Sequence, residues 1–112
     1  MKRIFLIATF SILLYSSCTF EKSEAISSDC LSPVSYSADV DTIISLRCGG
    51  CHGVGSLDGN LTDYAVLKTK VESGIFKSKV FITKEMPQGG PALPENELGK
   101  LKCWMEQGAL NN

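Results

Sequence analysis

The chain of 112 residues contains a single histidine, His52, and no large excess of charge of either sign. One imidazole excludes any site that requires two or more histidine ligands. The 11 basic and 12 acidic residues leave a formal net charge of −1, so no broad positive field is available to bind nucleic acid. The chain also lacks an apolar run of the about 20 residues that a membrane-spanning helix needs, and no internal repeat is visible.

The amino terminus has the pattern of an export signal. Lys2 and Arg3 precede a short apolar run over residues 4–15, which predicts a secretory signal peptide over residues 1–17. Ser16 and Ser17 before Cys18 are similar to the lipobox of bacterial lipoproteins. That similarity implies lipidation of Cys18 and a membrane-anchored protein that faces the periplasm or the cell exterior. An ordinary signal peptide cut nearby and an uncleaved anchor are the alternatives.

The rest of the chain predicts a polar tether over residues 18–33 and one domain over residues 34–112. Ser37 is the predicted cap of a first helix, and Thr62 caps a second helix that Gly74 ends. Residues 75–82 predict a short third helix or, because the segment is β-prone, a strand. Residues 83–94 contain three prolines and two glycines and predict irregular structure. A last helix is expected over residues 95–107, so the fold class is all-α.

The stretch Cys48-Gly49-Gly50-Cys51-His52 matches the C-x-x-C-H pattern of covalent haem attachment. Two thiols at this spacing add to the two vinyl groups of one haem c, and the adjacent imidazole supplies the proximal iron ligand. A thioredoxin-like redox pair is one alternative, but it requires alternating strands and helices. A zinc site is another, and it requires two further ligands.

The five cysteines divide unevenly among these roles. Cys18 is assigned to lipid and Cys48 and Cys51 to haem, which leaves Cys30 and Cys103. An even remainder in an exported protein favours a disulfide between these two cysteines. Two free, partly buried thiols are the alternative.

The distal iron ligand must come from a residue other than histidine. Met86 lies in the loop rich in proline and glycine and is followed by Pro87, which favours it as the distal ligand. Met105 falls on the apolar stripe of the last helix, where methionine is ordinary core filling. Met105 as the ligand, or an iron without a distal protein ligand, are the alternatives.

The haem motif, the Met86-Pro87-Gln88-Gly89-Gly90 loop and the closing segment 101–109 together resemble the class I monohaem cytochromes c, of the short bacterial lipoprotein type. The resemblance implies a small domain of three to five helices around one covalently attached haem. It also implies that the first and last helices cross, so that Val40, Ile43 and Ile44 meet Leu98, Leu101 and Trp104.

The functional expectation is a monohaem c-type cytochrome with His/Met ligation, which transfers electrons and is not itself an enzyme. Its expected partners are redox proteins such as an oxidase, a reductase or a dehydrogenase, and it acts as a free carrier or as a small subunit of such an enzyme. A haem protein with an open distal site, used in gas sensing or peroxidase-type catalysis, is the alternative.

Overall fold

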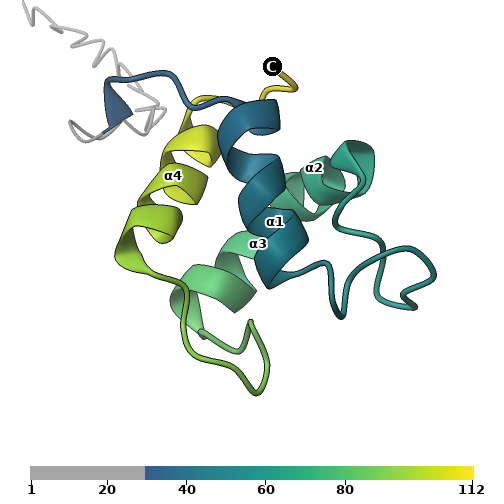
Figure 1. Ribbon diagram of the computed structural model, residues 1–112. Coiled ribbons are helices and arrows are strands. Elements are labelled where there is room, and N and C mark those ends of the chain that lie inside the picture. The colour runs from purple at the N-terminus through teal and green to yellow at the C-terminus, as the bar shows by residue number, and fades with distance from the viewer. Residues whose placement is uncertain (1–29) are drawn as a thin grey trace, which may run out of the picture.

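The computed structural model describes residues 30–112, and these residues form helices without any strand. The signal peptide, Cys18 and most of the predicted tether lie outside the described residues. Figure 1 shows the last helix, α4 (Glu95–Glu106), beside α1 (Asp41–Arg47), with α2 (Tyr64–Glu72) and α3 (Ile75–Lys77) completing the domain. The all-α prediction is therefore confirmed for this part of the chain, in which no helix is long and apolar enough to cross a membrane.

The first helical run consists of η2 (Tyr36–Val40), which is a π-helix, followed directly by α1 (Asp41–Arg47). Its cap is Ser35, whose hydroxyl accepts a hydrogen bond from the Ala38 amide at 3.2 Å. The prediction of Ser37 as the cap was wrong, because Ser37 already lies inside the helix. Its amide and its hydroxyl both donate instead to the Asn112 carbonyl oxygen, each at 3.0 Å.

The second helix, α2 (Tyr64–Glu72), is capped by Asp63, which accepts from the Val66 amide at 3.1 Å. Thr62 was predicted in this role, but its hydroxyl donates to Asn60 Oδ1 at 2.6 Å and is already engaged. The helix ends before Gly74, which has a φ of 77°. The prediction of Gly74 as the terminating residue is confirmed, since a left-handed residue commonly closes a helix.

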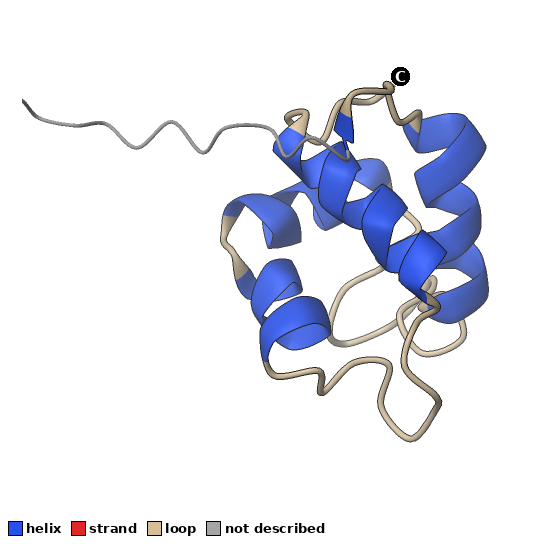
Figure 2. Ribbon diagram, turned by 90° about the vertical axis from the view of Figure 1, so that its left-hand side faces the viewer, coloured by secondary structure: helices blue, strands red, loops and turns tan. Residues whose placement is uncertain are grey.

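Residues 75–82 are helical, so the strand alternative is wrong. They form α3 (Ile75–Lys77) and the π-helix η3 (Ser78–Ile82). Phe76 and Val80, which are one helical turn apart, are both buried, so packing of one apolar face outweighs the local β propensity. Residues 83–94 are irregular, as predicted. Figure 2 shows this long loop in tan beside the helices.

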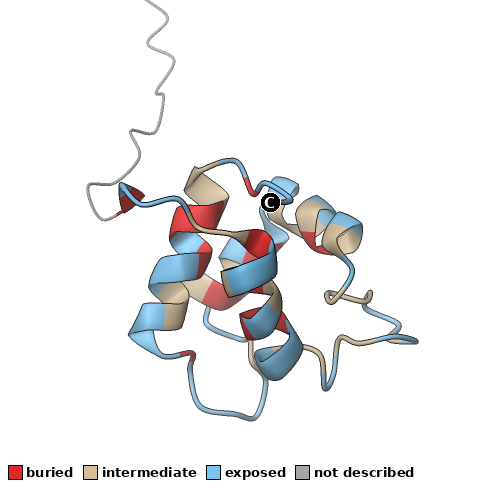
Figure 3. Ribbon diagram, turned by 45° about the horizontal axis from the view of Figure 1, so that its top comes forward, coloured by how far each residue is buried: buried red, intermediate tan, exposed pale blue. Residues whose placement is uncertain are grey.

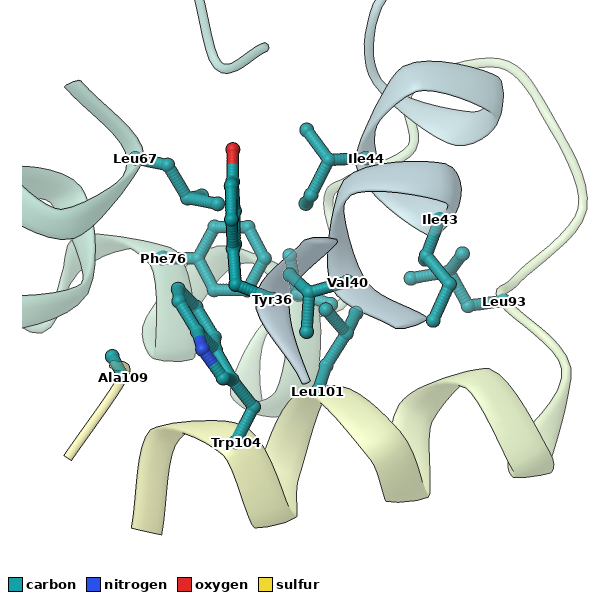
Figure 4. Close-up of a cluster of buried hydrophobic side chains, with 11 residues drawn as sticks. Tyr36, Val40, Ile43, Ile44, Leu67, Phe76, Leu93, Leu101, Trp104 and Ala109 are labelled. Carbon is teal, nitrogen blue, oxygen red and sulfur yellow. The ribbon is translucent and has the colours of Figure 1, made fainter. Parts of the chain in front are cut away.

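The last helix, α4 (Glu95–Glu106), begins after Pro94 and is followed by Gly108, which has a φ of 96°. Buried residues lie on the inner sides of α4 and the first helical run, whereas the loops are mostly exposed (Figure 3). The close-up in Figure 4 shows these side chains meeting in one cluster. The cluster contains Tyr36, Val40, Ile43, Ile44, Leu67, Phe76, Val80, Leu93, Leu101, Trp104 and Ala109, with Leu98 packed against it.

The carboxyl-terminal segment folds back over the aromatic members of this core. Trp104 Nε1 donates to the Leu110 carbonyl oxygen at 2.9 Å, and the Tyr64 hydroxyl donates to the Ala109 carbonyl oxygen at 2.8 Å. The centroid of the Tyr36 ring lies 5.0 Å from the ring centroid of Tyr64 and 5.8 Å from that of Trp104. The polar ends of the buried Trp104 and the partly buried Tyr64 therefore each have a backbone acceptor.

Candidate functional site

The C-x-x-C-H residues form a helical turn that continues α1. The amides of Cys48 and Gly49 donate to the Ile44 carbonyl oxygen at 2.8 and 2.9 Å, and the His52 amide donates to the Cys48 carbonyl oxygen at 2.7 Å. Residues three apart on a helical turn are neighbours on one side of it. The turn therefore brings Cys48 and Cys51 together on one side, and neither of them is part of a disulfide.

The two thiols have different surroundings. Cys48 is half-buried against the core, and its burial raises the pKa of the thiol, so the protonated form is favoured there. Cys51 is exposed. At Cys48, burial therefore disfavours the reactive thiolate that a thioredoxin-type redox pair uses.

The imidazole ring of His52 has a nitrogen without a hydrogen-bond partner in the described residues. Its Nδ1 is buried and has no hydrogen-bond partner among the described residues. Such an atom is uncommon in a folded protein, because losing water without gaining a partner is costly. The His52 backbone, by contrast, is fixed, since its carbonyl oxygen accepts from the Leu61 amide at 2.8 Å. The backbone of His52 is thus held in place, while one nitrogen of its ring has no partner within residues 30–112.

Met86 lies in the irregular loop and is packed against the core. Its amide donates to the Lys79 carbonyl oxygen at 3.2 Å, and its peptide bond to Pro87 is cis. The side chain lines a cavity of about 430 Å³ together with Phe81, Leu93 and Leu98. Met105 also packs against the core from α4 but does not line this cavity.

Cys48 of the motif and Met86 pack against one core, but the structure does not place the motif and Met86 in one cavity. Cys48, Cys51 and His52 are absent from the lining of the cavity that contains Met86. The walls of that cavity come from η3, the irregular loop and α4, together with Cys30. The two sequence-predicted halves of the site are therefore each placed on the core, and the joining of the two remains a proposal.

The described residues offer little support for a zinc site or a thioredoxin-like redox pair. No group of three or more His, Cys, Asp or Glu side chains gathers there in a way that could hold a metal ion, whereas a structural zinc site uses four such ligands. A thioredoxin-like arrangement needs a sheet, and residues 30–112 form no strand. A haem iron needs no such cluster, because the porphyrin itself supplies four nitrogen ligands.

Cys30 and Cys103 are joined by a disulfide in the structure, with their Cα atoms 5.0 Å apart. Gln107 strengthens the same junction, since its Nε2 donates to the carbonyl oxygens of Cys30 and Ser32 at 3.0 and 2.8 Å. Residues 30–33, which were predicted to be part of the tether, are thus fastened to the end of α4.

An ion pair beside the motif was not predicted from the sequence. Arg47 Nε and Nη2 donate to the two carboxylate oxygens of Glu97 at 2.9 and 2.8 Å. The hydrogen bond from Arg47 lowers the pKa of Glu97, and the same bond raises the pKa of Arg47. The two residues are 50 positions apart in the sequence, so only the fold reveals their contact. The sequence itself shows only that Arg47 directly precedes Cys48 of the motif.

Comparison with known proteins adds no relatives. No protein-family model, curated protein or solved structure matches the chain.

Proposed function

We propose that this chain is an electron carrier that holds one covalent haem c on the Cys48–His52 turn. The observation that carries the proposal is this turn, on which two unpaired cysteines and the chain's sole histidine follow one another at the end of α1. The unmatched Nδ1 of His52 fits a residue whose side chain serves a group outside the polypeptide. When bound, haem c supplies an iron that alternates between Fe(II) and Fe(III).

Each residue has a separate task in this proposal. Cys48 and Cys51 form the two thioether bonds, and His52 donates an imidazole nitrogen to the proximal side. Met86 supplies a thioether sulfur to the distal side and excludes water and small ligands from it. Phe81, Leu93 and Leu98 supply apolar side chains to the cavity that Met86 lines, whereas Lys84, Glu95 and Lys102 supply charged ones.

The remaining parts of the proposal concern the place of the protein in the cell. An export signal over residues 1–17 and a lipid on Cys18 would anchor it to a membrane, facing the periplasm or the cell exterior. A carrier of this kind passes electrons between larger redox proteins, which are its expected partners. Mass analysis of the extracted protein measures the haem, the lipid and the disulfide in the same sample.

The central test is the distal ligand. The wild-type protein should show the weak far-red absorption band of methionine sulfur bound to ferric iron, and Met86→Ala should abolish it and admit carbon monoxide to the ferrous protein. Met105→Ala is the matched control, because Met105 packs against the same core but does not line the cavity that contains Met86. The Met105→Ala variant should keep the band. A wild-type haem protein without the band that readily binds carbon monoxide favours gas sensing or peroxidase-type catalysis instead.

A further inference from the structure

We infer that Arg47 and Glu97 form a positioning pair that holds the haem-attachment turn beside the wall of the Met86 cavity. This inference rests on the proposed function. Arg47 is the last residue of α1 and directly precedes Cys48. Glu97 lies in the first turn of α4, next to Leu98 and Gly99, which line the cavity that contains Met86. One ion pair therefore connects the two halves of the proposed site.

Backbone contacts between α4 and the first helical run are concentrated at η2. Further along, Ile43 and Ile44 of α1 share the core with Leu101 of α4. The ion pair adds a polar link beyond these residues, at the end of α1 that leads into the motif. Arg47 and Glu97 reach across at that place with two parallel hydrogen bonds, and a two-pronged guanidinium–carboxylate pair fixes orientation as well as distance.

Glu97 is itself well held. Its side chain is only 18% exposed, against 42% for Arg47. Its amide donates to the Pro94 carbonyl oxygen at 3.0 Å, and its negative charge lies in the first turn of α4, where the helix dipole favours it. The carboxylate is thus a fixed point on α4 to which the guanidinium of α1 attaches.

A second ion pair between the same helical units provides a matched control. Lys100 Nζ contacts Asp39 Oδ1 at 2.7 Å and joins α4 to η2. Its carboxylate partner lies at the opposite end of the first helical run from the motif. Both pairs are partly exposed, so removal of either should cost a similar, small amount of stability.

The test compares Glu97→Gln and Arg47→Gln with Asp39→Asn in the haem-loaded protein. Imidazole competes with Met86 for iron, and its apparent affinity rises with the fraction of molecules in which the distal sulfur has moved away. Loss of the Arg47–Glu97 pair should raise the apparent imidazole affinity about two- to fivefold, the factor that corresponds to an ion pair of modest strength. Asp39→Asn should leave that affinity unchanged, while all three variants lower the urea midpoint by similar amounts.

The outcomes separate this inference from the proposed function. A wild-type chain without covalent haem by mass, or without the far-red band, overturns the proposed function and this role together. A wild-type protein with haem and the band, in which Glu97→Gln and Asp39→Asn change imidazole affinity equally or not at all, overturns only the positioning role. The ion pair is then a structural link with no bearing on the site.

Discussion

Gly49 and Gly50 occupy neighbouring places in the motif but meet different surroundings. A Cβ atom on Gly49 would lie 2.6 Å from the Ser45 carbonyl oxygen, whereas a Cβ atom on Gly50 would meet nothing within 4 Å. The Ser45 carbonyl belongs to the backbone of α1 and cannot turn aside as a flexible side chain can. Position 49 therefore needs glycine for the tight exit from α1.

We expect Gly49→Ala to lower the free energy of unfolding by about 1–3 kcal/mol, the usual cost of forcing extra atoms into a packed site. Gly50→Ala should be tolerated. Urea unfolding measures both variants, and the fraction of chains that carry haem, determined by mass, should fall for Gly49→Ala alone. Equal behaviour of the two variants would contradict this account of the turn.

Single residues also show where sequence reasoning succeeds and fails. The motif residues were identified because their spacing is specific, and Gly74 because a helix end favours glycine. The two helix caps were misplaced by one or two positions. Ser35 and Ser37 are the same residue type, and both hydroxyls donate to the Asn112 carbonyl oxygen. Ser35 is the cap because the helical backbone begins directly after it, at Tyr36.

Two ion pairs connect the first helical run to α4, and both depend on pH. Hydrogen bonds from Lys100 and Arg47 lower the pKa values of Asp39 and Glu97 in the folded protein. A carboxyl group with a lowered folded-state pKa stabilises the fold above its ordinary pKa of about 4, and this contribution is lost as the pH falls through the lowered value.

We therefore expect the wild-type protein to lose stability progressively as the pH falls below the ordinary carboxyl pKa of about 4 and through the lowered folded-state values. The double variant Asp39→Asn and Glu97→Gln should start from a lower urea midpoint at neutral pH and lose less on acidification. Because the basic partners Arg47 and Lys100 are exposed to solvent, the difference should be small and should shrink in high salt. A double variant with the same acid loss as the wild type would show that other groups control the transition.

At the scale of the whole molecule, the Cys30–Cys103 disulfide joins the start of the described chain to α4 across 73 positions. Both cysteines are buried, with 3% and 8% exposure. Closing a loop of this length removes much of the freedom of the unfolded chain, which the chain-entropy model values at about 4 kcal/mol.

Replacement of both cysteines, Cys30→Ala with Cys103→Ala, should lower the free energy of unfolding by about 2–4 kcal/mol. Cys18→Ala, which lies outside the described residues, is the control and should leave the unfolding midpoint unchanged. Thermal or urea unfolding makes the comparison. An unchanged midpoint in the double variant would show that the hydrogen bonds of Gln107 are sufficient to hold this junction.

The sequence by itself determined the helical class, the irregular loop over residues 83–94 and the candidate residues Cys48, Cys51, His52 and Met86. These rest on local spacing and on the conformational limits of proline and glycine, which act over a few residues. The tertiary structure alone decided that residues 75–82 are helical and that Arg47 meets Glu97. Those features depend on contacts between distant segments, whose free energy arises only when the chain is folded.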